Sequence, residues 1–233
     1  MIRNLLFSVV FFSGIILISI IFIPALFLPQ KIVIIGGKMM GYWSAFCLKK
    51  ILLTEIILKG KENIVTEEKF FIASSHQSMF ETFYLQTIFN SPIFILKKEL
   101  LKIPIFGWYL KKIGSISIKR NKTTKDNLNF FDQISEKIKK TDRPLIIFPQ
   151  GSRLKTEQRT PFKKGASRIY DELKIKCQPV AINSGKTWPK EGPLKCKEQL
   201  IISILKPINS GIDKNEFLRL LENTIYSELD KIN

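Results

Sequence analysis

From residue 54 to the end of the chain, short apolar runs alternate with longer amphipathic segments, and this alternation constrains the fold strongly. Strands are predicted at residues 54–58, 70–74, 92–96, 115–119, 144–148, 179–183 and 200–205, and helices at residues 79–89, 105–112, 125–140, 164–173 and 214–230. In one of these helices Leu128, Phe131, Ile134 and Ile138 recur at three- and four-residue spacing, which is typical of one apolar helix face. The pattern predicts an α/β fold with a mixed central sheet flanked by helices.

The N-terminal part of the chain is its most apolar part. Residues 5–28 contain no charged residue. As a helix they would reach about 36 Å, at about 1.5 Å per residue. That is enough to cross a hydrocarbon core of about 30 Å. A cleaved signal peptide is the alternative, although its apolar region usually runs only about 7 to 15 residues.

A second apolar stretch, residues 32–48, is interrupted by two glycines and a lysine. Tyr42 and Trp43 within it are residue types that favour the membrane interface. We therefore predict an N-terminal membrane-binding helix pair in residues 1–52, followed by an α/β domain in residues 53–233.

The formal net charge of +17 predicts an acidic partner, such as an anionic membrane surface, a phosphorylated substrate or nucleic acid. Against nucleic acid, the chain contains no recognisable nucleic-acid-binding motif. Cys47, Cys177 and Cys196 form no CxxC pair, so neither a disulfide framework nor a structural zinc site is predicted. A reducing compartment is the simpler inference.

The single histidine, His76, follows a predicted strand in the run Ser74-Ser-His-Gln-Ser-Met-Phe-Glu81. Five residues rotate about 500° on an ideal helix, so His76 and Glu81 would diverge if both were helical. Ser78-x-x-Glu81 matches a capping box, and a helix that begins there would leave His76 in the preceding loop. The two side chains could then meet as a proton-transfer pair. In the alternative reading Glu81 only satisfies the backbone at Ser78, and His76 is an ordinary packed histidine.

A second polar run, Phe148-Pro-Gln-Gly-Ser-Arg153, closes another predicted strand. Gly151 permits a tight turn, turn amides can hold an anion, and Arg153 can bind phosphate in a bidentate manner. Arg120, which also follows a predicted strand, has the same capacity. The chain contains no GxxxxGK[ST], GxSxG or HExxH run. Ligands in open sheets gather at the carboxyl ends of strands, where both polar runs lie.

These runs resemble the glycerolipid acyltransferase family, and most closely its bacterial 1-acylglycerol-3-phosphate (lysophosphatidic acid) acyltransferases. The four matching blocks are His76 to Glu81 with Ser78, Lys97 with Arg120, Phe148-Pro-Gln-Gly-Ser-Arg153, and Pro179-Val-Ala181, in order along the chain. Two residues depart from the family pattern: Glu81 stands where the family has aspartate, and Gln150 stands where it has glutamate.

The resemblance implies transfer of a fatty acyl group to the sn-2 hydroxyl of lysophosphatidic acid, which gives phosphatidic acid in phospholipid biosynthesis. Acyl-CoA or acyl carrier protein would be the co-substrate, and neither a cofactor nor a metal is implied. His76 would be the general base, with Glu81 orienting its ring. The acceptor phosphate would be held by Lys97, Arg120 and Arg153, and the acceptor-binding loop would comprise Gln150, Gly151 and Ser152.

The resemblance also implies a place at the bacterial inner (cytoplasmic) membrane, with the catalytic domain on the cytoplasmic side and no nucleic-acid partner. Two alternatives stay open: an acyltransferase for another lysophospholipid or for glycerol-3-phosphate, and a catalytically inactive lipid-binding protein. Acyl-chain length, the choice of thioester donor and the oligomeric state are left open by the sequence.

Overall fold

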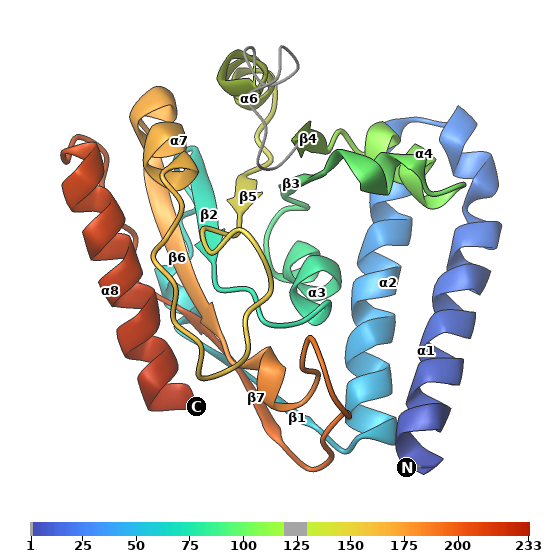
Figure 1. Ribbon diagram of the computed structural model, residues 1–233. Coiled ribbons are helices and arrows are strands. Elements are labelled where there is room, and N and C mark those ends of the chain that lie inside the picture. Colours follow the sequence, from blue (N-terminus) through green and yellow to red (C-terminus); the bar gives the residue numbers. More distant parts are fainter. Residues whose placement is uncertain (1, 119–129) are drawn as a thin grey trace.

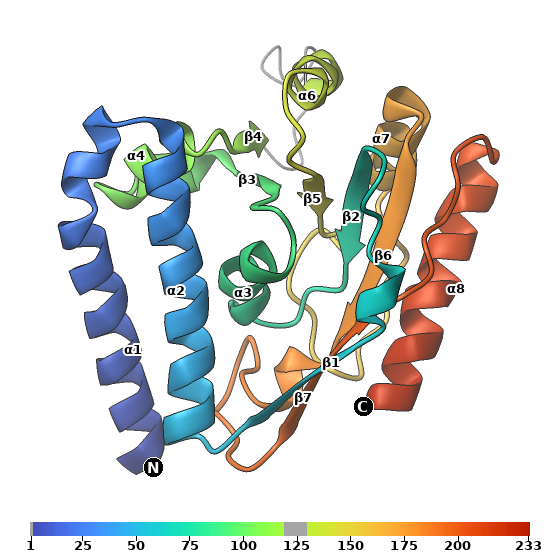
Figure 2. The same ribbon diagram turned by 180° about the vertical axis from the view of Figure 1, so that it is seen from behind.

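The computed structural model describes residues 2–118 and 130–233, which form one seven-stranded sheet with helices on both faces (Figures 1 and 2). The strands are β1 (Glu55–Lys59), β2 (Phe70–Ser74), β3 (Ile93–Lys97), β4 (Ile116–Ile118), β5 (Leu145–Ile147), β6 (Lys176–Ile182) and β7 (Gln199–Ile204). The helices are α1 (Ile2–Ile21), α2 (Gln30–Ile51), α3 (Phe80–Ile88), α4 (Phe106–Lys112), α6 (Phe130–Lys139), α7 (Gly165–Leu173) and α8 (Lys214–Ile232). Short 3-10 turns are η1 (Ile23–Phe27), η2 (Lys61–Asn63), η3 (Lys98–Lys102) and η4 (Ser184–Lys186). The predicted α/β class with a mixed sheet is confirmed.

The strand order is β1-β7-β6-β2-β5-β3-β4, and each neighbouring pair is parallel except β6 and β7. The five adjacent strands β6, β2, β5, β3 and β4 therefore run in one direction. Because the carboxyl ends of parallel strands meet at the same edge, the loops after these strands come together there. This edge collects the polar runs that the sequence places far apart.

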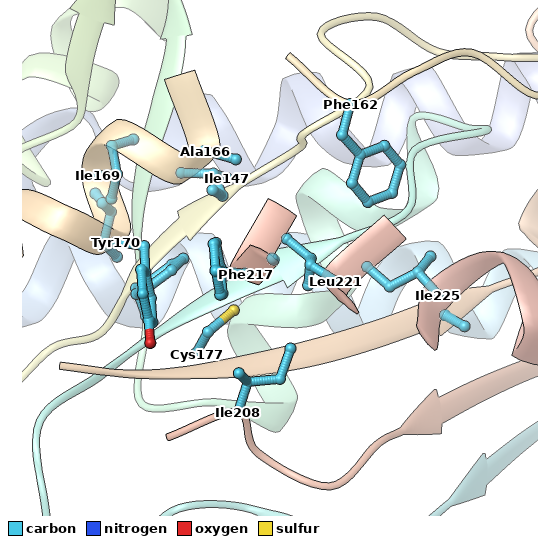
Figure 3. Packing of buried hydrophobic residues seen from close by; sticks show 14 of the residues in the cluster. Ile147, Phe162, Ala166, Ile169, Tyr170, Cys177, Ile208, Phe217, Leu221 and Ile225 are labelled. Atoms are coloured by element: carbon cyan, nitrogen blue, oxygen red, sulfur yellow. The ribbon is translucent and has the colours of Figure 1, made fainter. Parts of the chain in front are cut away.

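The central strands are mostly apolar because helices cover both faces of the sheet. Along β2, Phe71 and Ala73 belong to one hydrophobic cluster, whereas Ile72 belongs to the other. The first cluster lies between the sheet and α6, α7 and α8, where Phe217, Leu221 and Ile225 line one face of α8 (Figure 3). The second lies between the sheet and α1, α2 and α3.

Helix α1 has one face in the protein core and an opposite apolar face exposed. Phe7 and Phe11 are 1% and 0% exposed, and their ring centroids lie 5.1 and 4.9 Å from that of Trp188. The next residue along, Phe12, is 50% exposed. Within the described residues, α1 is the one helix long and apolar enough to cross a membrane. Because α1 shares a hydrophobic core with the sheet, the predicted boundary at residue 52 separates two parts that pack together.

Arg143 joins the segments that precede three strands on the β3 side of the sheet. Its Nε donates to the Ser91 carbonyl at 2.6 Å, and its Nη1 donates to the Ile113 carbonyl at 2.7 Å. Burial lowers the pKa of the Arg143 guanidinium from its usual value. Arginine nevertheless remains charged in proteins, so both hydrogen bonds are charge-assisted.

Candidate active site

His76 lies in the loop between β2 and α3, and Glu81 lies in the first turn of α3, as the sequence predicts. The Ser78 hydroxyl accepts a hydrogen bond from the Phe80 N–H at 3.2 Å. In return the Glu81 carboxylate accepts from the Ser78 N–H at 3.0 and 3.1 Å. Glu81 therefore satisfies the backbone at Ser78 and also faces the histidine, although the N-cap residue of α3 is Met79 and not Ser78.

The imidazole of His76 and the carboxylate of Glu81 form a partly buried pair. His76 Nδ1 lies 3.4 Å from Glu81 Oε2, with the histidine side chain 12% and the glutamate side chain 0% exposed. Nδ1 is buried and makes no hydrogen bond within the described residues, so the two groups lie within ion-pair distance without forming a hydrogen bond. Catalytic hydrogen bonds are often long in unliganded sites and tighten when substrate binds. Nε2 is left as the ring nitrogen available to a ligand.

The buried carboxylate of Glu81 is stabilised by donors on three residues. The N–H groups of Gln77 and Ser78 donate to it, and so does the hydroxyl of Ser184. A buried carboxylate without such donors would carry a large desolvation cost. The arrangement therefore suits an ionised group.

The two polar runs are joined through His76. Its ring stacks on Phe148 with centroids 4.1 Å apart and planes 20° apart. Its N–H donates to Gln150 Oε1 at 2.6 Å, and its carbonyl accepts from the Leu154 N–H at 2.9 Å. Gln150 is only 3% exposed, so its side chain positions the histidine backbone. An amide oxygen accepts this hydrogen bond as a carboxylate oxygen would, so glutamine can make this contact in place of glutamate.

Gly151 makes a sharp turn in the second polar run. Its φ is +77°, and its N–H donates to the Phe148 carbonyl at 2.9 Å, which closes the turn. A residue with a Cβ is strained at this φ. Ser152 and Arg153 follow this turn and line the same cavity as His76.

A cavity of about 540 Å³ lies beside His76, between α2, α3, α4 and β3. This volume is within the range of about 300–1,000 Å³ that is usual for ligand sites. Its basic lining residues are Lys97, Arg153 and Lys190. Its apolar lining includes Val33, Met40, Phe83, Phe94, Phe106 and Leu110. Gly36 and Gly37 of α2 also line it, where an added Cβ would meet Phe22 at 2.8 Å and Gln86 at 2.6 Å, respectively.

The structure brings most of the predicted site residues to one place. His76, Lys97, Ser152 and Arg153 line the cavity, whereas Glu81 and Gln150 support the histidine from behind. Arg120 lies outside the described residues. The roles predicted for these residues stay predictions.

Two residues at the site were not predicted. Lys190 lies in an exposed loop without a recognisable pattern. Ser184 follows an apolar strand, and only its position at a strand end could have indicated a function. In the part of the chain that the structure describes, no group of three or more His, Cys, Asp or Glu side chains could hold a metal ion.

The fold and the site define an α/β protein with a histidine–carboxylate pair at an apolar cavity. A family model described as acyltransferase matches residues 55–183. The chain belongs to this acyltransferase family, as the four sequence blocks predict.

Two of the curated relatives carry the same activity in their names. The chain is 34% identical over 153 residues to the 1-acyl-sn-glycerol-3-phosphate acyltransferase of Pseudomonas aeruginosa, covering 63% of this chain and 59% of that protein. It is 41% identical over 120 residues to the enzyme of the same name from Helicobacter pylori, covering 50% of each. The matched region thus spans only about half to three-fifths of these relatives' length.

A solved structure extends the similarity in fold to the whole chain. The 1-acyl-sn-glycerophosphate (LPA) acyltransferase PlsC from Thermotoga maritima matches with a TM-score of 0.81, covering 100% of this chain and 98% of that one. At 21% sequence identity, this similarity concerns the fold, including the N-terminal helices.

Proposed function

We propose that the protein transfers a fatty acyl group from an acyl thioester to the sn-2 hydroxyl of lysophosphatidic acid, giving phosphatidic acid and a free thiol. The observation that carries the proposal is the pairing of His76 with Glu81 beside a cavity that has three basic side chains and a largely apolar lining. Such a cavity suits a ligand with one anionic group and one long alkyl chain. The names of the curated relatives support the same reaction.

In this mechanism His76 Nε2 accepts the proton of the acceptor hydroxyl as the hydroxyl oxygen attacks the thioester carbonyl. Glu81 Oε2 stabilises the positive charge that develops on the ring through its proximity to Nδ1. The tetrahedral intermediate then collapses, the carbon–sulfur bond breaks, and the proton passes from His76 to the departing thiolate. A positioned base of this kind contributes a factor of about 10²–10⁴ to the rate.

The basic residues of the cavity account for recognition of the acceptor. Arg153 would bind the phosphate of lysophosphatidic acid, with Lys97 adding a second charge. The apolar lining contributed by α2, α3 and α4 would receive an alkyl chain. Arg120 would join the phosphate site, as the resemblance implies.

We also propose that the protein is held at the cytoplasmic face of a bacterial inner membrane. The exposed apolar residues of α1 and η1, which include Leu5, Phe12, Leu17 and Phe27, support contact with lipid. A net charge of +17 supports attraction to anionic lipids. Protease protection of the α/β domain in sealed inside-out vesicles would contradict the cytoplasmic orientation.

The test is thiol release from acyl-CoA or acyl carrier protein thioester by full-length protein reconstituted in phospholipid. Lysophosphatidic acid, another lysophospholipid and glycerol-3-phosphate are supplied as separate acceptors. We expect release that depends on lysophosphatidic acid and disappears in His76→Ala. Release with only another acceptor would refute the proposed acceptor. Folded protein that releases no thiol with any acceptor would refute the reaction and leave the lipid-binding alternative.

A further inference from the structure

Ser184 is a buried hydroxyl that none of the four sequence blocks contains. It begins η4, two residues after the end of β6, and lies one residue beyond the region that the family model matches. The residue is 0% exposed, and its hydroxyl donates to Glu81 Oε1 across a sequence separation of 103 residues. The buried hydroxyl therefore has as its partner the carboxylate that lies beside the imidazole.

The two oxygens of Glu81 have different surroundings. Oε1 accepts from the N–H groups of Gln77 and Ser78, each at 3.1 Å, and from the Ser184 hydroxyl. Oε2 accepts only the Ser78 N–H at 3.0 Å, and it faces His76 Nδ1. A carboxylate oxygen offers about two lone pairs. Oε1 is therefore saturated, whereas Oε2 keeps accepting capacity in the direction of the imidazole.

Among the residues that the structure describes, Ser184 supplies the one side-chain hydrogen bond to this carboxylate, and it lies in a different element from the two N–H donors. Gln77 and Ser78 approach from the loop before α3, whereas Ser184 approaches from the end of β6. Donors from two elements restrict rotation about the last bond of the glutamate side chain. Without Ser184, both remaining donor residues would lie in the same loop as the histidine.

We propose that Ser184 is a positioning residue that acts through Glu81. By holding Oε1, it keeps Oε2 directed at His76 Nδ1, so that the proton of the neutral ring stays on Nδ1 and Nε2 is free to accept one. Its effect on catalysis rests on the proposed function. Its effect on the tautomer of His76 does not depend on the proposed function, because it is measured on the folded protein without substrate.

The first experiment uses the fact that the chain has one histidine, so that ¹⁵N-labelled histidine gives the signals of a single ring. Full-length protein in detergent micelles is studied under conditions in which the ring is neutral. In wild-type protein we expect a protonated Nδ1 and an unprotonated Nε2, which differ strongly in chemical shift. Ser184→Ala should move both signals toward their mean, because the two tautomers then mix. Wild-type signals in folded Ser184→Ala would overturn the proposal.

Ser203→Ala is the matched control. Ser203 is also buried, at 2% exposed, and its hydroxyl donates to Glu228 Oε1 at 2.8 Å, between β7 and α8. This variant should leave the ring signals unchanged, and an equal change in both variants would overturn the proposal. If Ser184→Ala does not fold, Ser184→Cys replaces it, because a thiol is only a weak donor. Wild-type signals in the folded cysteine variant would likewise overturn the proposal.

The second experiment measures acyl transfer. Ser184→Ala should lower kcat by about tenfold to a hundredfold, as expected for loss of one hydrogen bond to a charged group. KM for the acceptor should stay within about twofold, because Ser184 does not contact substrate. Unchanged kcat in Ser184→Ala would overturn the catalytic consequence. Absence of transfer by wild-type protein would instead refute the proposed function, and the ring signals would still decide the role of Ser184.

Discussion

Replacing Phe11 by alanine tests whether the inner face of α1 belongs to the protein core. Phe11 is fully buried, and its ring centroid lies 4.9 Å from Trp188, 5.7 Å from Phe83 and 5.6 Å from Phe7. If α1 were simply surrounded by lipid, this side chain would have no fixed partners. The structure instead places it in the cluster that covers one face of the sheet.

The expected loss of stability in Phe11→Ala follows from this packing. A buried phenylalanine replaced by alanine usually destabilises a protein by about 3–5 kcal/mol. Lipid or detergent tails can receive the ring when α1 detaches, so that mainly packing is lost. We therefore expect Phe11→Ala to destabilise the protein by about 3 kcal/mol, at the lower end of this range. Phe12→Ala, at the half-exposed neighbouring position, should change stability by less than about 0.5 kcal/mol.

The assay is urea unfolding of both variants as full-length protein in the same detergent, followed by circular dichroism. Amide hydrogen exchange of α1 provides a second measurement, in which Phe11→Ala should lose protection and Phe12→Ala should not. Equal destabilisation by the two variants would refute the reasoning, because it would mean that neither face of α1 is specifically docked.

Three further changes test other parts of the structure. Arg143→Met should destabilise the protein by about 2–4 kcal/mol, because two partly buried carbonyls lose charge-assisted donors. Thermal unfolding unchanged within error would contradict this. Gly151→Ala should lower the free energy of unfolding by about 1–2 kcal/mol, because the φ of residue 151 is +77° and the new Cβ would lie 3.2 Å from Lys163 Cγ. An unfolding temperature equal to that of wild type in a calorimetric scan would contradict this strain. Arg153→Ala should raise KM for lysophosphatidic acid by about tenfold or more. Arg168→Ala, on the exposed face of α7, is the control and should leave KM unchanged. Equal KM values for the two variants in steady-state assays would show that Arg153 does not bind the phosphate.

Most elements could be predicted because their signals are local. Strands β2, β5 and β7 are short apolar runs, and α8 has an apolar stripe, so their positions follow from periodicity. The prediction for β6 began at residue 179, three residues late, because Lys176 and Gln178 do not resemble a buried strand. Gln178 is nevertheless fully buried, since it accepts from the Val65 N–H and donates to the Leu205 carbonyl. Those partners lie far away in the sequence.

The sequence by itself determined the α/β class, the apolar N-terminus and the match to the acyltransferase blocks, and it offered the meeting of His76 and Glu81 as one of two readings. Each depends on residues close together or on a motif of fixed spacing. Only the tertiary structure decided which face of α1 is buried and that Gln150 supports the histidine backbone. It also decided that Ser184 meets Glu81. These contacts join segments tens of residues apart, and their geometry exists only after the parallel strands have brought their carboxyl ends to one edge.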